Sequence, residues 1–140
     1  MIKQFKIKRV LQGRFYKGEE IVSSIIKFLK ENSITSGLIS GIGAVTRAKV
    51  GYYDQSEKNY ISREFNEPME ILSLKGNVSI KDGEPFPHIH IVLSKEDFSC
   101  IGGHIYEAEV FAFEFEVIEF DGISFERAFD EDTGLFLWKS

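Results

Sequence analysis

The chain contains a single cysteine, three prolines and one tryptophan among its 140 residues. Because Cys100 has no second cysteine to pair with, an intrachain disulfide and a cysteine-based zinc finger are both excluded. We interpret Cys100, which follows Ser99 and precedes the apolar Ile101, as a buried small residue rather than a nucleophile. The sequence also lacks a phosphate-binding P-loop and a serine nucleophile elbow.

Long apolar runs are missing as well. The most apolar stretch, residues 110–120, is interrupted by Glu114, Glu116 and Glu119, whereas a membrane helix needs roughly 20 apolar residues. The sequence does not open with the charged and then apolar segments of a secretory signal. We therefore expect a cytoplasmic protein with no membrane partner and, from the chain length, a single domain over residues 1–140.

Positive charge is in deficit, with a net charge of -5 and a pI near 5.3. This balance is unfavourable for a protein whose main partner is a phosphate backbone. The charge is nevertheless uneven, because residues 1–17 hold six basic residues and no acid, whereas residues 125–132 hold four acids. The basic segment either forms a local basic face or supplies the solvent-facing positions of an alternating strand.

One segment, residues 19–31, has the apolar spacing of an amphipathic helix, with Gly18 as a candidate N-cap and Asn32 as a candidate end. Most of the remaining chain is rich in β-branched and aromatic residues and predicts strands. These strands are expected over residues 2–11, 37–40, 48–53, 59–65, 69–80, 86–94, 99–107 and 109–120. The predicted fold class is α+β, with one main helix packed on a largely antiparallel, multi-stranded sheet.

The segment Gly41-Ile42-Gly43 follows a predicted strand, as a dinucleotide-binding loop would. Thr46 stands where that fingerprint needs a third small residue, and residues 47–53 are extended in character rather than helical. We interpret the segment as a tight turn. Its backbone N–H groups could alternatively bind an anion.

All three histidines of the chain lie within seventeen positions, as His88, His90 and His104. On a strand, His88 and His90 point to one face and lie about 6.5 to 7 Å apart along the chain. Residues 95–98 predict a hairpin turn, which places residues near 102–106 opposite residues near 88–90. Apolar residues occupy the odd positions of both strands, so His104 should share the even face with the other two histidines, provided that no bulge shifts the register.

Three imidazoles on one face predict a metal site in which three ligands leave one coordination position open. Zinc is the first candidate, and nickel, iron or copper are compatible with the same ligand type. The alternative is that the three histidines hydrogen-bond to one another, to water or to nearby acids. Gly102 and Gly103 favour the metal site, because the absence of side chains lets a ligand or another backbone approach closely.

The segments 87–90 and 102–104, separated by a short polar hairpin, resemble the prokaryotic form of the plant and prokaryote conserved (PPC) domain. The same resemblance is carried by Gly18-Glu19-Glu20, by residues 40–44 and 51–53, and by residues 67–74 with Gly76-Asn77. It extends from about Arg14 to Glu119 and implies an α+β fold that assembles as a homotrimer. It also implies that prokaryotic members keep histidines at positions 88, 90 and 104, whereas plant members do not.

Plant members of this family carry DNA-contacting AT-hook segments, and prokaryotic relatives are labelled as predicted DNA-binding proteins by association. The Arg-Gly-Arg-Pro hook does not occur in this sequence, which weakens that label. A stretch through which plant members contact partners corresponds to residues 67–72, but its residues differ here. Within that stretch, the resemblance makes Glu70 the first carboxylate to consider as a general base or as a partner of a metal ligand.

These observations are consistent with two different kinds of function. The first is a metal-binding protein in which His88, His90 and His104 hold a zinc-like ion; if it is an enzyme, it is a metal-assisted hydrolase acting on a small substrate. The second is a DNA-associated or regulatory module without catalytic activity. A third, less defined option is an oligomer that binds a small molecule at a subunit boundary.

Overall fold

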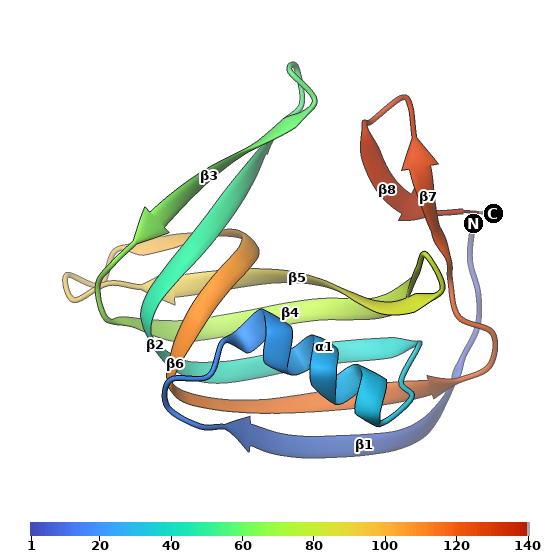
Figure 1. Cartoon of the computed structure of the whole chain (residues 1–140), viewed down its shortest axis with the longest axis horizontal. Helices are drawn as coiled ribbons and strands as arrows, with labels where there is room; N and C mark the ends of the chain where they lie inside the picture. Colours follow the sequence, from blue (N-terminus) through green and yellow to red (C-terminus); the bar gives the residue numbers. More distant parts are fainter. Residues whose placement is uncertain (140) are drawn as a thin grey trace.

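The computed structural model describes residues 1–139, and most of them belong to β-strands (Figure 1). The strands are β1 (Lys6–Phe15), β2 (Gly37–Asp54), β3 (Asn59–Phe65), β4 (Met69–Lys81), β5 (Glu84–Ser94), β6 (Cys100–Asp121), β7 (Arg127–Asp130) and β8 (Leu135–Trp138). A helix, α1 (Ile21–Glu31), lies between β1 and β2 in the sequence. Strands account for 65% of the residues and helix for 8%.

The expected α+β class with a main helix is therefore wrong, because the protein is mainly β and α1 is a short element. The expectation of a largely antiparallel sheet is confirmed. The class was misjudged because several predicted short strands merge into long ones, of which β2 has 18 residues and β6 has 22. Within residues 1–139, no helix has the length and apolar character needed to cross a membrane.

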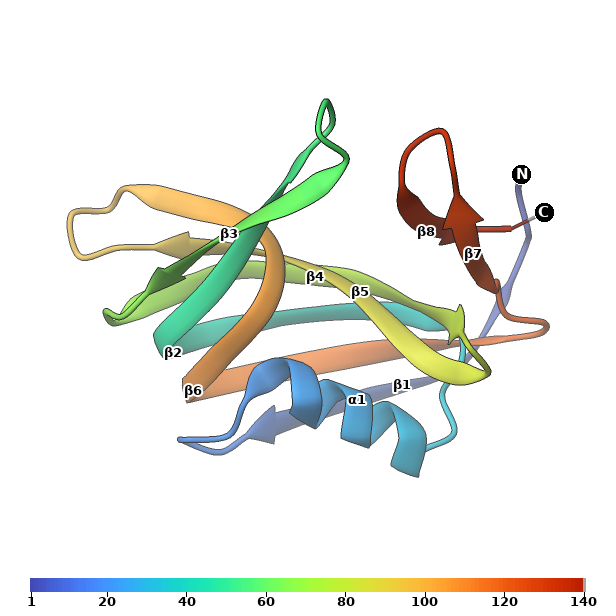
Figure 2. The ribbon, with the colours of Figure 1, turned by 45° about the horizontal axis from the view of Figure 1, so that its top comes forward.

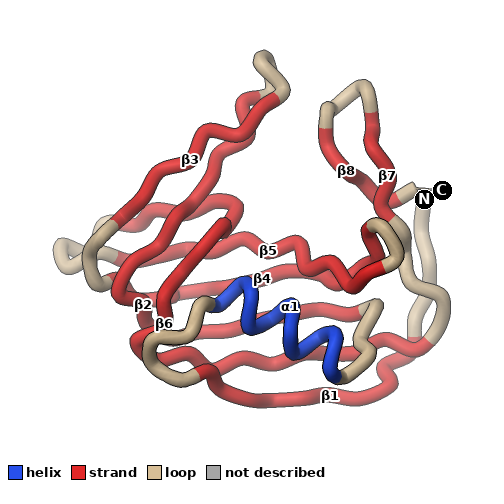
Figure 3. The backbone as a smooth tube through the Cα atoms, in the orientation of Figure 1, coloured by secondary structure: helices blue, strands red, loops and turns tan. Residues whose placement is uncertain are grey.

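Six strands form one sheet in the order β1-β6-β5-β4-β2-β3, and β2 also pairs with β6. The strands β2, β4, β5 and β6 therefore form a closed ring of hydrogen-bonded neighbours, which the curved ribbons of Figure 2 follow. The hairpin β7–β8 forms a separate two-stranded sheet. It projects from the same side of the molecule as the β2–β3 hairpin (Figure 3).

Bulges, rather than turns, account for the length of β2. The predicted tight turn at Gly41-Ile42-Gly43 is wrong, because these residues continue β2 across a shift in its register with β4. A Cβ atom on Gly43 would lie 2.1 Å from the carbonyl oxygen of Ala112. Glycine is therefore needed here because the backbones of β2 and β6 approach each other closely, and the strand bends instead of ending.

The core lies between α1 and one face of the sheet. Ile21, Ile25 and Leu29 form the buried stripe of α1, and they belong to the same buried cluster as Phe113 and Val110 of β6. Their spacing of four residues places all three on one side of the helix, as the sequence predicted. Cys100 does not join this core: its side chain is exposed, so the expectation of a buried cysteine is wrong.

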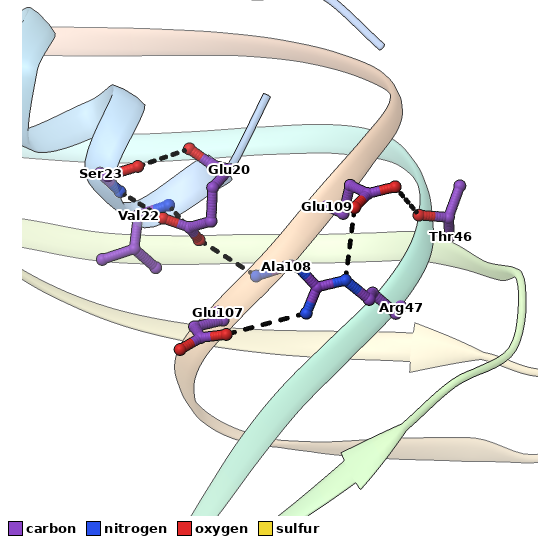
Figure 4. A network of polar contacts seen from close by, with 8 residues as sticks. All are labelled: Glu20, Val22, Ser23, Thr46, Arg47, Glu107, Ala108 and Glu109. Carbon is purple, nitrogen blue, oxygen red and sulfur yellow. Dashed lines mark hydrogen bonds and ion pairs between the residues drawn. The ribbon is translucent and has the colours of Figure 1, made fainter. Parts of the chain in front are cut away.

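The N-terminus of α1 is capped by Glu20, not by Gly18 as the sequence suggested (Figure 4). The Glu20 carboxylate accepts hydrogen bonds from the backbone N–H groups of Val22 (2.9 Å) and Ser23 (2.7 Å). It also accepts one from the N–H of Ala108 in β6 (3.1 Å). One side chain thus satisfies free N–H groups of the helix and fixes the helix to the longest strand.

We predict that Glu20→Ala lowers the free energy of unfolding by about 1–2 kcal/mol, because it removes the helix cap and leaves the Ala108 N–H without its partner. Denaturant unfolding followed by circular dichroism measures this change. Glu31→Ala is the matched control, since Glu31 is an exposed acid at the other end of α1 whose i,i+4 partner is Lys27. Equal destabilisation by the two substitutions would contradict the capping role.

Candidate metal centre

The three histidines come from two neighbouring strands, His88 and His90 from β5 and His104 from β6. His90 lies directly opposite His104 in the antiparallel ladder, while Ile89 and Ile91 are buried on the other face of β5. The register predicted from the alternation of apolar residues is therefore confirmed, and no bulge turns His104 away. Strand geometry alone thus brings the three rings to one face.

The rings form a compact triangle. Their centroids are 5.0 Å apart for His88 and His90, 5.6 Å for His88 and His104, and 5.8 Å for His90 and His104. One nitrogen from each ring can be chosen so that the three atoms all lie within 4.8 Å of one another. Tetrahedral Zn–N bonds of about 2.0–2.1 Å separate their ligand atoms by roughly 3.4 Å, so small rotations of the rings suffice to reach that geometry.

Burial keeps two of the imidazoles neutral. Burial, helped by the charge of Arg127 and by the neighbouring His90 and His104, lowers the pKa of His88 from 6.5 to about 4. The pKa of His104 is also lowered, by burial and then by His90. Metal ions bind the neutral form of imidazole, so at neutral pH these two rings do not have to release a proton first.

A buried nitrogen of His104 has no protein partner. Among residues 1–139, nothing within hydrogen-bond distance satisfies His104 Nδ1. Polar atoms that are buried and unpaired are rare in proteins, and they indicate a missing ligand, ion or water. The donor set, the distances and this unpaired atom together fit a first-row transition metal.

Tyrosines flank the histidines on the side of the β2–β3 hairpin. The ring of Tyr60 lies 5.2 Å from that of His104, and the ring of Tyr106 lies at the same centroid distance from His104 and 5.9 Å from Tyr60. Burial raises the pKa of Tyr60, with a further contribution from Tyr53. These neutral aromatic rings shield part of His104 from water and add no charge beside it.

On the opposite side, the β7–β8 hairpin approaches His88. Arg127 of β7 donates a hydrogen bond to Asn77 Oδ1 (2.9 Å), and Asn77 is the β4 residue paired with His88. At their tips the two hairpins are in contact, because Tyr53 Oη donates to the carbonyl of Thr133 (2.6 Å) and Lys58 Nζ donates to the carbonyl of Glu131 (2.8 Å). The histidines thus lie between two hairpins that join at their ends.

Glu70 is not brought to the histidines. It is an exposed residue near the start of β4, paired with Ala44 and Ser94, whereas His90 pairs with Lys75 further along the same strand. It lines a different cavity, of about 710 Å³, together with residues of the β5–β6 turn. A direct contact between Glu70 and the three histidines therefore has no support in the structure.

Sequence reasoning missed the residues that surround the histidines. Tyr60, Asn77 and Arg127 come from three other strands, and neither composition nor spacing connects them to positions 88–104. The one signal present in the sequence is the Gly76-Asn77 motif, which carries the family resemblance but does not by itself indicate a role for Asn77. Arg127 lies in a segment that carried no motif.

We predict that the metal-free protein loses thermal stability as the pH falls from about 6.5 towards 4, and that His88→Gln reduces this loss. In the unfolded chain an imidazole titrates near 6.5, whereas His88 in the folded protein titrates near 4, so the unfolded state binds more protons between these values. Thermal melts in chelator over this pH range measure the slope of melting temperature against pH. An identical slope in the variant and the parent would contradict the lowered pKa.

Comparison with known proteins places the chain in a family. It matches the Plants and Prokaryotes Conserved (PCC) domain over residues 2–121. A metal-containing protein from Archaeoglobus fulgidus is 48% identical to it, with a TM-score of 0.96 and coverage of 100% of this chain and 99% of that one. A PPC protein from Pyrococcus horikoshii is 38% identical, with a TM-score of 0.94 and coverage of 100% and 98%.

A third solved structure, described as a candidate DNA-binding protein from Bacteroides thetaiotaomicron, is 31% identical, with a TM-score of 0.89 and coverage of 97% and 96%. Curated proteins give no match. The domain match covers most of the chain, and relatives above 30% identity are similar to it over nearly their whole length. The protein therefore belongs to the plant and prokaryote conserved (PPC) domain family.

Proposed function

We propose that this PPC-domain protein binds one divalent transition-metal ion through His88, His90 and His104, with zinc as the first candidate. The convergence of three imidazole nitrogens to within 4.8 Å of one another carries the proposal. The unpaired Nδ1 of His104 and the description of the Archaeoglobus relative as metal-containing support it. Nickel, iron and copper share the preference for imidazole, so the ligand type does not select among these ions.

When bound, an ion with three protein ligands supplies an open coordination position and acidifies a water molecule held there. The contribution of the protein is to present neutral imidazoles from a partly desolvated surface. If the protein is an enzyme, metal-assisted hydrolysis of a small substrate is the reaction class that this donor set supports. Glu70, the carboxylate expected from the sequence, lies near the start of β4, apart from the three histidines of the same chain.

We also propose that the protein assembles as a homotrimer, as its family resemblance implies. The face of the sheet opposite α1 carries an uncovered apolar row, in which Val10 of β1 and Leu38 of β2 lie on either side of Ile118 of β6. Val10 is 55% exposed and Leu38 is 46% exposed. Ile42, on the same face of β2 and 59% exposed, is separated from this row by the polar rung of Gln12, Glu116 and Ser40. Exposed apolar residues that lie side by side, as Val10, Ile118 and Leu38 do, are typical of subunit interfaces.

DNA association is the second candidate, because a relative at 31% identity is described as a candidate DNA-binding protein. The basic N-terminal segment gives it little support. Lys8 and Arg9, from its centre, both pair with the buried carboxylate of Glu119. With these charges engaged and a net charge of -5, metal binding remains the favoured function.

We predict that the protein purified without a histidine tag contains about one zinc-like ion per chain, and that His90→Ala removes it. Elemental analysis gives the stoichiometry. Adding zinc to the metal-free protein should raise its melting temperature, since an ion that binds the folded state alone stabilises it by about 2.7 kcal/mol at 100 times its Kd. His90 is exposed, so its substitution tests the ligand role with little effect on packing.

Cys100→Ser is the matched control for this experiment, because it removes the exposed thiol of the one cysteine and leaves the histidines in place. This variant should keep its metal and its zinc-dependent rise in melting temperature. Retention of metal by His90→Ala, or its loss from Cys100→Ser alone, would contradict the proposed ligand set.

For the assembly, light scattering coupled to size exclusion should give a mass of about 48 kDa, three times the 16.0 kDa of the chain. Leu38→Glu should shift the mass towards the monomer, because it places a charge in the uncovered apolar row. Ile123→Glu, the same change at a residue that is 85% exposed in the β6–β7 connection, should leave the mass unchanged. A monomeric parent protein would exclude the trimer.

A further inference from the structure

Arg127 is a half-buried cation that is held in place by neutral groups. Its Nε donates to Ser79 Oγ (2.8 Å), its Nη1 to the carbonyl of Phe136 (2.9 Å) and its Nη2 to Asn77 Oδ1 (2.9 Å). Ser79 is completely buried, so β4 anchors one edge of the guanidinium firmly. These bonds use three of the five N–H donors of the guanidinium and leave one on each Nη nitrogen.

No carboxylate of residues 1–139 forms an ion pair with Arg127, in contrast to Arg9, which pairs with Glu119, and Arg47, which pairs with Glu107 and Glu109. Burial lowers the pKa of Arg127, with no opposing contribution from an acid. A partly buried charge without a counter-ion is costly. The guanidinium faces neutral acceptors and the rings of Phe86 (5.3 Å) and Trp138 (5.8 Å), so a bound anion would supply the opposite charge that the described residues do not.

Arg127 shares a cavity with one of the histidines. A cavity of about 390 Å³ is lined by Arg127, His88 and Asn77 together with Met1, Leu137 and Trp138. Its volume falls within the range of small-molecule sites. Asn77 and His88 line the β4–β5 side and Arg127 comes from β7, while the indole of Trp138 and the side chain of Leu137 supply an apolar wall from β8. Such a lining suits a small molecule with an anionic head and a flat or apolar body.

We propose that this cavity binds a small organic molecule through an oxyanion group, either a carboxylate or a phosphate. The two remaining N–H donors of Arg127 donate hydrogen bonds to this group. A guanidinium edge matches the two oxygens of such a group. Arg127 lies beyond residues 2–121, over which the chain matches its family domain. Placement of the ligand beside an ion at His88 rests on the metal-binding function proposed above, whereas binding of the oxyanion to Arg127 does not.

Trp138 is the only tryptophan of the chain and lines the cavity, so its fluorescence reports occupancy. The experiment titrates benzoate, phenyl phosphate and benzamide, which share one aromatic body and differ in the head group, into the full chain with chelator and again with zinc. We expect benzoate or phenyl phosphate to bind about tenfold or more tightly than neutral benzamide. The tighter of the two anions identifies the preferred head group.

Arg127→Met should abolish this preference for an anion, because it keeps the length of the side chain and removes the guanidinium. Lys81→Gln is the matched control: Lys81 lies over the rings of Phe136 and Phe86, near the cavity but not lining it, and the variant should keep the preference. If Arg127→Met fails to fold, Arg127→Lys replaces it and should lose most of the preference, since an ammonium lacks the two-donor edge.

Equal binding of benzoate, phenyl phosphate and benzamide by the parent protein would overturn the inference without reference to any variant. An equal loss of preference in Arg127→Met and Lys81→Gln would overturn it too, because general positive charge would then explain the selectivity. Anion preference in chelator with no zinc binding would leave the inference standing and remove only the metal function. Stoichiometric zinc binding without anion preference would overturn the inference and leave the metal function standing.

Discussion

The close approach of β6 to β2 is the constraint on which the rest of the structure depends. β6 forms ladders with β1, β2 and β5, so one strand joins the helix-covered part of the sheet to the part that carries the histidines. The approach is possible only where side chains are missing: a Cβ on Gly103 would lie 2.3 Å from the carbonyl oxygen of Gly51. Because His104 directly follows Gly103, the same contact that closes the sheet also positions one of the three imidazoles.

Partial burial of the histidines then determines their protonation state. The β2–β3 hairpin brings Tyr60 against His104, and the β7–β8 hairpin brings Arg127 near His88, so two of the three rings are partly shielded from water. Their affinity for protons falls as a result, which favours neutral nitrogen donors. The guanidinium contributes twice, because it disfavours protonation of His88 and attracts an anion to the adjoining cavity.

The sequence predicted those features that depend on local alternation. Because the apolar residues, Ile89 and Ile91 among them, occupy odd positions, the even-numbered His104 was expected on the same face as His88 and His90. Alternation cannot distinguish a bulge from a turn, so Gly41-Ile42-Gly43 was expected to end a strand that it only bends. The predicted helix was found, but its cap was misplaced, because the role of Glu20 depends partly on Ala108, a residue far away in sequence. The role of Arg127 was missed for the same reason: its side-chain partners, Ser79 and Asn77, lie on β4.

The contact between the two hairpin tips has an evolutionary consequence. Both acceptors are main-chain carbonyls, those of Thr133 and Glu131, whereas both donors are side chains, Tyr53 and Lys58. Across the bridge itself, amino-acid identity is therefore required of Tyr53 and Lys58, whereas the side chain of Glu131 is free to vary. On the β7–β8 side the requirement falls on the shape of the turn, because the Asp130 carboxylate accepts hydrogen bonds from the backbone N–H and the hydroxyl of Thr133, and Gly134 adopts a positive φ beside Tyr53.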